Sequence, residues 1–137
     1  MAGIGTTSAQ VKSDGTSAGS GTDLMYLAFT AGANGSYVDK VRFFSVASAA
    51  ATTGVATTLR AYLSTVAAPG ATTSSNTFLL GEVSVPAISS SHSTNATNYY
   101  DITLGIVIAT TYYIHVSQHV AQTTNQRWNA MVYGGNY

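Results

Sequence analysis

Residues 111–120, which read TYYIHVSQHV, decide how this chain folds. Large apolar or aromatic side chains recur at every second position of this stretch. One series is Tyr112, Ile114 and Val116, and the alternate series is Tyr113, His115 and Ser117. Because successive side chains of a β-strand point to opposite faces, a period of two predicts a strand with one face turned to a core.

Six further segments are similarly rich in β-branched and aromatic residues and are separated by clusters of turn residues. They are residues 24–30, 37–47, 57–66, 77–85, 99–108 and 127–133. The pair Asn34-Gly35 is a strong signal for a tight turn, and Gly105 interrupts the segment 99–108. Short strands at regular spacing are typical of a β-sandwich or jelly roll. We therefore expect one all-β domain, a sandwich or jelly roll of seven or eight antiparallel strands.

The N-terminal segment, residues 1–22, differs from the rest in composition. It is rich in Gly, Ser, Thr and Ala, and Ile4 and Val11 are its only sizeable apolar residues. Such a composition predicts an extended, flexible arm that precedes a domain at residues 23–137. We expect a neighbouring chain to hold this arm, with Ile4 and Val11 among the contacts.

Charge is the most unusual property of the chain. Only 7% of its 137 residues are charged, and five acidic and five basic side chains cancel. In ordinary soluble domains about a quarter of the residues are charged. A chain with so little charge has almost no field with which to attract nucleic acid or an anionic membrane, so neither is expected as a partner. Two interpretations stay open: a soluble domain coated with Ser, Thr and Asn, or a surface largely covered by partners, since interface cores are depleted in charge.

Cysteine is absent, which excludes disulfides and thiol chemistry. The first residues lack the basic and apolar regions of a signal peptide, and no stretch is long and apolar enough to span a bilayer. We therefore expect synthesis in the cytoplasm.

Catalytic and metal-binding motifs are not evident. His115 and His119 are four residues apart, which along a strand is about 13 Å, too far for two imidazoles to share one metal ion. We expect both on an outer or interface face. The acids are too scattered to indicate a glycosidase pair, and Asp39 with Lys40 and Arg42 is expected to form a surface ion-pair cluster. No nucleophile motif or phosphate-binding loop is present, so neither a cofactor nor enzymatic activity is expected.

Tyrosine is the residue most suited to contacts here. The pairs Tyr99-Tyr100 and Tyr112-Tyr113 each put one ring on either side of a strand, so at least two rings should point away from the core. An exposed tyrosine combines a large apolar area with a polar tip, as interfaces favour. The residues expected to bind partners are Ile4, Val11, Tyr113, His115 and Tyr137.

Three segments within residues 24–137 resemble small virion proteins of tailed bacteriophages. The first runs from Phe29 to Ser36, reads FTAGANGS and is followed by Val38 and Val41. The second is TTLR at 57–60 with Leu79-Leu80 and Glu82, and the third is the ending VYGGNY, with Asn136 where these proteins have Asp. The arm at 1–22 lies outside the match.

This resemblance implies a capsid decoration or cement protein without catalytic residues. Such proteins commonly form trimers at threefold positions of the virion surface, where they clamp adjacent subunits of the major capsid protein. A carbohydrate- or receptor-binding module of a phage head or tail fibre is the alternative, with Trp128, Asn129 and Tyr133 as candidate contacts. A hydrolase of jelly-roll shape is the third hypothesis, and it requires acids that meet only in space.

Overall fold

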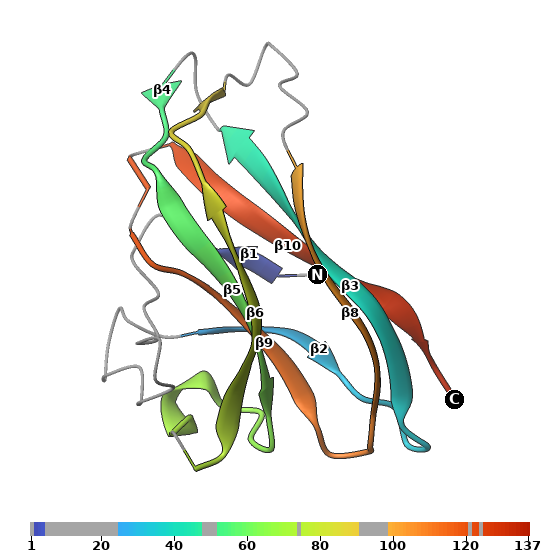
Figure 1. Cartoon of the computed structure of the whole chain (residues 1–137). Helices are drawn as coiled ribbons and strands as arrows, with labels where there is room; N and C mark the ends of the chain where they lie inside the picture. The colour runs from blue at the N-terminus through green and yellow to red at the C-terminus, as the bar shows by residue number, and fades with distance from the viewer. Residues whose placement is uncertain are drawn as a thin grey trace.

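The computed structural model describes residues 2–4, 25–47, 52–73, 75–90, 99–120, 122–123 and 125–137. These residues form short and long β-strands and one 3₁₀-helix, and every strand pair is antiparallel (Figure 1). The elements are β1 (Ala2–Ile4), β2 (Tyr26–Thr30), β3 (Ser36–Ala47), β4 (Thr52–Thr53), β5 (Thr57–Ser64), η1 (Pro69–Ala71), β6 (Thr77–Val85), β7 (Ser89–Ser90), β8 (Tyr99–Ile108), β9 (Tyr113–Gln118) and β10 (Gln126–Asn136).

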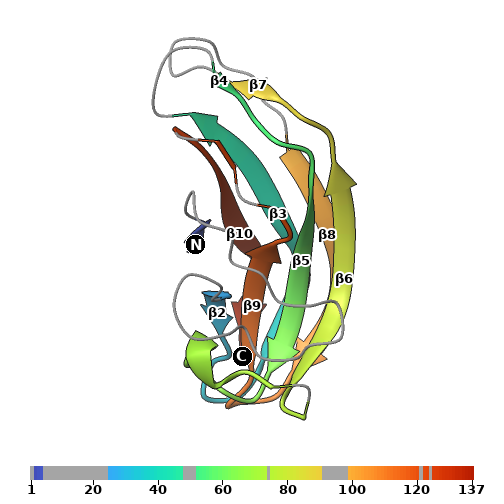
Figure 2. The same cartoon turned by 90° about the vertical axis from the view of Figure 1, so that its left-hand side faces the viewer.

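Two four-stranded sheets form the body of the molecule. The first sheet has the strand order β1-β10-β3-β8, and the second has the order β2-β9-β5-β6. The strands β4 and β7 pair separately at one end, opposite the end that carries η1 and the turn between β8 and β9 (Figures 1 and 2). The expected all-β sandwich is therefore confirmed.

The core lies between the two sheets and follows the period of two. Val41 and Phe43 of β3 are fully buried, as are Ile114 and Val116 of β9. Trp128 of β10 is also buried. The remaining buried apolar residues of this core are Ala28, Val38, Leu59, Ala61, Val85, Ile102, Ile108 and Ala130. Ile114 and Val116 thus face the core, as the period of two in residues 111–120 predicted, and Tyr112 of the same series packs half-buried against it.

Glycines shape the strands at two points. Gly35 adopts a φ of 87° in the turn between β2 and β3, which confirms the tight turn predicted from Asn34-Gly35. Gly105 has a φ of 60° where the pairing of β8 with β3 shifts register. It therefore bends β8 at a bulge and does not end the strand.

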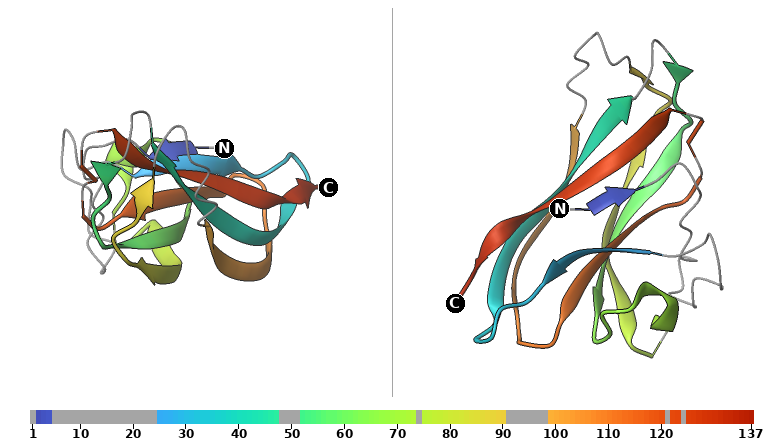
Figure 3. Two further views of the ribbon diagram at one scale, coloured as in Figure 1. Left: turned by 90° about the horizontal axis from the view of Figure 1, so that it is seen from above. Right: turned by 180° about the vertical axis from the view of Figure 1, so that it is seen from behind.

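The start of the chain pairs with its own body. Residues Ala2–Ile4 form β1 and pair antiparallel with β10, with Ile4 opposite Trp128 (Figure 3). The sequence led us to expect a contact of this segment with a neighbouring chain, whereas residues 2–4 pair with a strand of the same chain. Val11 and the expected boundary between residues 22 and 23 lie outside the described residues.

Candidate functional site: an aromatic face on the first sheet

The outer face of the first sheet is rich in aromatic rings and has an arginine at its centre. Val38, Val41 and Phe43 of β3 point into the core, so the side chains between them point outward. The register then places the outward side chains of β10 and β8 beside those of β3. We call the resulting set the aromatic face; it consists of Tyr37, Lys40, Arg42, Phe44, Tyr99, Asp101, Met131 and Tyr133.

Arg42 is fixed by groups on both neighbouring strands. Its Nε donates to Asp101 Oδ1 at 2.6 Å, and its Nη2 donates to Asp101 Oδ2 at 2.7 Å. Two parallel bonds of this kind are the strongest arrangement of a guanidinium with a carboxylate. The guanidinium carbon also lies 4.0 Å from the ring centre of Tyr99 and 5.5 Å from that of Tyr133, both within cation–π range. Arg42 is therefore held in one orientation.

Lys40 and Phe44 extend the cluster along β3. Lys40 Nζ lies 3.3 Å from Asp101 Oδ2 and 5.3 Å from the ring centre of Tyr133. Phe44 and Tyr99 have ring centres 6.4 Å apart with planes inclined at 51°. This separation is within the range in which aromatic pairs attract each other. The face thus forms a continuous set of contacts across three strands.

The pKa values of the two central groups move in the direction that strengthens the ion pair. The hydrogen bonds from Arg42 are the main cause that lowers the pKa of Asp101 below its ordinary value, and Lys40 acts in the same direction. The same bond raises the pKa of Arg42. Asp101 therefore stays ionised at neutral pH, which makes it a poor proton donor for catalysis.

The ion-pair cluster was predicted with the wrong acid. The sequence pointed to Asp39 because it is adjacent to Lys40, but both Lys40 and Arg42 pair with Asp101. Arg42 and Asp101 are directly opposite each other in the β3–β8 register, whereas Asp39 lies where that register shifts. The cross-strand neighbour therefore replaces the sequence neighbour.

Asp101 and Glu82, two of the three carboxylate side chains in the described residues, lie on opposite outer faces of the sandwich, and the third, Asp39, is exposed on β3. Asp101 is on the first sheet, and Glu82 accepts a bond of 2.9 Å from Nε of Arg60 on the second sheet. Two packed sheets lie about 10 Å apart, and both acids point outward, so they are farther apart than glycosidase pairs. Each is also neutralised by an arginine.

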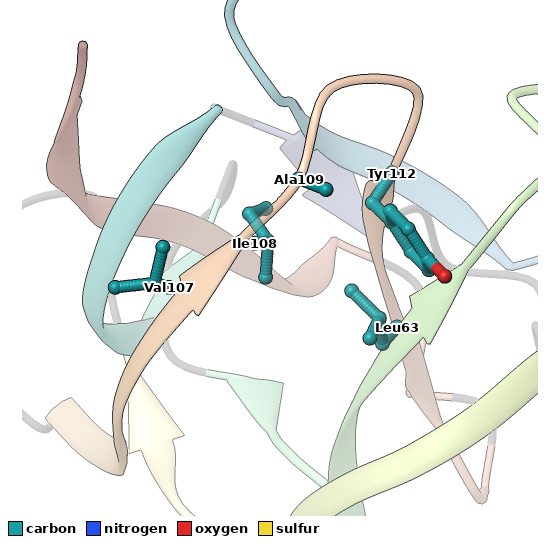
Figure 4. A pocket seen from close by; sticks show the side chains of 5 residues that line it. All are labelled: Leu63, Val107, Ile108, Ala109 and Tyr112. Carbon is teal, nitrogen blue, oxygen red and sulfur yellow. The ribbon is translucent and has the colours of Figure 1, made fainter. Parts of the chain in front are cut away.

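A small apolar pocket lies at the end of the sandwich that carries the turn between β8 and β9. Its volume is about 260 Å³, and it is lined by Leu63, Val107, Ile108, Ala109 and Tyr112. Figure 4 shows Leu63 and Ile108 directed toward the hollow from facing strands. Ligand pockets usually have about 300–1,000 Å³, so this hollow is too small for a substantial ligand.

The turn beside this pocket contains a strained residue. Thr111 has a φ of 68°, a left-handed conformation that is rare for a β-branched side chain. We expect Thr111→Gly to raise the free energy of unfolding by about 1 kcal/mol, since glycine removes the left-handed strain. Chemical denaturation measures this change. Asn125→Gly is the comparison, because Asn125 has a φ of 69° and asparagine tolerates that conformation well. An equal gain at both positions would contradict the steric explanation.

The structure distributes the predicted contact residues over several environments. Tyr137 is 63% exposed, Tyr113 is half-buried at the start of β9, and His119 is exposed. His115 lies on the side of β9 that faces away from the core, as predicted, but it is completely buried there, and its ring bonds to the carbonyl oxygen of Val66. The structure brings none of these residues into the aromatic face.

The three residues that the sequence suggested as sugar contacts, Trp128, Asn129 and Tyr133, also lie in different environments. Trp128 is buried and packs edge-on against Tyr100 at 5.8 Å, so it is not a surface ring. Tyr133 belongs to the aromatic face, and Asn129 points outward from the same strand opposite Phe44. The rings Tyr99 and Phe44 were not predicted as a site. The sequence signal for this site was the pair Tyr99-Tyr100, since adjacent residues of a strand point to opposite faces and one of the two rings must point outward.

Comparisons with known proteins add no relative: no family model, no curated protein and no solved structure matches the chain. Within the described ranges, no helix has the length and apolar character needed to cross a membrane. In the same part of the chain, no three or more His, Asp or Glu side chains gather where they could hold a metal ion.

Proposed function

We propose that this chain is a structural protein of a virion, a capsid decoration or cement protein that bridges major capsid subunits as a homotrimer. The observation that carries the proposal is the composition of the aromatic face. Aromatic residues, Met and Arg are enriched in interface cores, and tyrosine and arginine are frequent among the residues that dominate binding energy. The face holds four aromatic rings, Met131 and Arg42 on one sheet surface.

Preorganisation of the face also supports this role. Binding costs free energy when side chains must be immobilised. Arg42 is already locked between Asp101 and the Tyr99 ring, with only 22% of its side chain exposed. A partner that packs on this face therefore meets side chains that have largely lost their freedom.

The strand order further supports a jelly roll. Leaving out β4 and β7, the eight strands pair as a folded-over hairpin: β1 with β10, β2 with β9, β3 with β8 and β5 with β6. Rolling that hairpin adds the pairs β10 with β3 and β9 with β5, which gives both observed sheets. Jelly rolls occur in viral capsid proteins and in lectins. This argument is one of fold analogy, so the aromatic face has to carry the functional part.

The free edge of β8 adds a second means of contact. β8 is ten residues long and borders the aromatic face, and among the described strands it pairs on one side only, with β3. Unpaired backbone groups of a long edge strand are suited to pairing with a strand of another chain. A cement protein that binds along β8 would gain backbone hydrogen bonds beside its side-chain contacts.

We expect Tyr99→Ala to weaken binding to capsids at least tenfold, about 1.4 kcal/mol. Tyr99 is 50% exposed, so about half of its surface is open to a partner. The assay measures binding of the purified chain to heads of the phage that encodes it, stripped of this protein. Phe78→Ala is the matched control, because Phe78 is 52% exposed but lies on the second sheet. Equal binding of both variants would contradict a role for the aromatic face.

The oligomeric state is tested separately: a monomer in sedimentation equilibrium would contradict the homotrimer.

A carbohydrate- or receptor-binding module is the second candidate. It is favoured by Tyr99 and Tyr133 lying on one face with Asn129, since rings beside amide groups suit sugar binding. A glycan array separates the two functions. Hits that disappear in Tyr99→Ala, together with no binding to capsids, would replace the cement function with this one.

A further inference from the structure

The outer face of the second sheet carries a strip of polar side chains that are buried although they point away from the core. Leu59 and Ala61 of β5, like Ile114 and Val116 of β9, belong to the core, so the residues between them point away from it. These residues are Arg60, Tyr62, His115 and Ser117. Nevertheless Tyr62, His115 and Ser117 have no exposed surface, and Arg60 is 7% exposed.

Arg60 is satisfied by its neighbours, but three other polar atoms are not. Arg60 donates from Nε to Glu82 at 2.9 Å and from Nη1 to Nδ1 of His119 at 3.1 Å. By contrast, the hydroxyls of Tyr62 and Ser117 and Nδ1 of His115 are buried without a hydrogen-bond partner. A buried polar atom in that state costs about 1–3 kcal/mol, so three together call for an explanation.

The hydrogen bond made by Nε2 of His115 determines whether Nδ1 donates or accepts a hydrogen bond. Nε2 lies 2.9 Å from the carbonyl oxygen of Val66. A carbonyl oxygen only accepts, so Nε2 carries the proton and donates it. Burial lowers the pKa of His115, which favours the neutral ring. Nδ1 therefore bears a lone pair and requires a donor.

The three unsatisfied atoms belong to adjacent side chains. Tyr62 is directly opposite His115 in the β5–β9 register, and Ser117 follows two residues later on the same side of β9. Directly opposite residues have Cβ atoms about 5 Å apart, and diagonal ones about 7–8 Å. Burial raises the pKa of the Tyr62 hydroxyl, while a hydrogen-bond interaction with Ser117, followed by the charge of Arg60, lowers it. The two hydroxyls are therefore close to each other, although no bond of full hydrogen-bond geometry joins them.

The chemistry of this cluster selects one class of ligand. The ligand must donate to Nδ1 and exchange hydrogen bonds with two hydroxyls, each of which is able to donate and to accept. An anion cannot donate to the Nδ1 lone pair. A metal ion would find one nitrogen and two neutral hydroxyls beside the positive Arg60, which is a poor donor set. A substrate has no access to side chains that are fully buried. Only a small neutral molecule that both donates and accepts fits.

We propose that Tyr62, His115 and Ser117 together bind one internal water molecule, which donates to His115 Nδ1 and exchanges hydrogen bonds with the two hydroxyls. Buried waters typically make about three hydrogen bonds to polar groups that otherwise lack partners. The water links side chains of β5 to side chains of β9. This inference does not depend on the proposed function.

Nuclear magnetic resonance on the whole chain tests the proposal. In the wild-type protein we expect a long-lived water signal in contact with the Ser117 side chain, and a His115 Nδ1 resonance displaced from that of an unbonded nitrogen. The double variant Tyr62→Phe with Ser117→Ala removes two of the three anchors. We expect it to lose the water contact and to return the Nδ1 resonance to the unbonded position.

Ser84→Ala is the matched control, because Ser84 is an exposed serine on the neighbouring strand β6. It should leave the water signal and the Nδ1 resonance unchanged. The proposal is overturned if the wild-type protein shows no long-lived water and an unbonded Nδ1, or if the double variant keeps both signals. Should the double variant not fold, the wild-type spectrum alone decides between these results.

Discussion

Replacing Gly134 with alanine is expected to lower the free energy of unfolding by about 3 kcal/mol, the upper end of the usual cost of overpacking. A Cβ at this position would overlap the carbonyl oxygen of Tyr37 and would lie 3.0 Å from the Cα of Val38. Both obstacles are backbone atoms, so no side-chain rotation relieves them. Alanine therefore has to push β10 away from β3.

The register explains why the approach at Gly134 is so close. The pairing of β10 with β3 shifts between Tyr133 and Gly134, where Asp39 has no direct partner in β10. β3 is paired on its other side with β8, so it cannot shift freely. Strand separation would break the pairs that follow, up to Asn136 with Ser36.

Gly135→Ala is the control for this prediction. It lies one residue further along β10, and a Cβ there would meet no atom within 4 Å. Because alanine restricts the unfolded chain more than glycine does, this variant should be neutral or up to about 1 kcal/mol more stable. Chemical denaturation of both variants is the measurement. Equal stabilities would show that the close approach of β10 to β3 at Gly134 has been misjudged.

Strand positions were the part of the fold that the sequence predicted best. The segment 77–85 was predicted with the bounds that β6 has, because Pro86 cannot continue the ladder and a turn cluster precedes Thr77. The short strands β4 and β7 were assigned to loops, since two residues cannot display a period. β1 was assigned to an arm because its Gly- and Ala-rich sequence gives no strand signal.

The contacts between distant strands were outside the reach of the sequence. Arg42 and Asp101 are 59 residues apart, and their pairing depends on the register of β8 against β3. The alternation around Tyr99 and Tyr100 indicated that one ring faces outward, but not that Arg42 would stack on it. The aromatic face is therefore a product of register, which local patterns do not encode.

Burial of His115 shows a different limit of sequence patterns. The period of two correctly placed this residue on the side of β9 away from the core. Alternation assigns a side chain to a face of the sheet, but it does not say what covers that face. Part of the cover is the chain after β5, where the Val66 carbonyl oxygen accepts a hydrogen bond from Nε2 of the imidazole ring.

That burial leads to the second large effect: the protein should lose stability as the pH falls below about 6.5, the ordinary pKa of histidine. Burial lowers the pKa of His115 in the folded state, with the Val66 bond as a smaller opposing effect. At pH values between the pKa of His115 in the folded state and its pKa in the unfolded state, the unfolded chain binds a proton that the folded chain does not bind. The free energy of unfolding therefore decreases by up to about 1.4 kcal/mol per pH unit in this window.

Apart from the Val66 carbonyl, the groups around His115 do not favour the protonated ring. Tyr62 faces the ring from β5 and is neutral in this pH range, and Val66 offers one carbonyl that is already bonded. Arg60, two residues before Tyr62 on the same side of β5, would repel a second positive charge, and Glu82 already binds Arg60. Asp101 has a lowered pKa as well, but its ordinary value of 3.8 confines its effect to more acidic solution.

Urea denaturation at a series of pH values between 7 and about 4.5 measures this effect, and His115→Asn is the variant that isolates it. Asparagine cannot take up the proton, so the dependence of stability on pH should become nearly flat in that range, whatever the absolute stability of the variant. His119→Asn is the control, because His119 is exposed and its loss should leave the slope in place. A slope that persists in His115→Asn and disappears in His119→Asn would assign the acid sensitivity to the surface. The buried ring would then have to be accessible to protons in the folded protein.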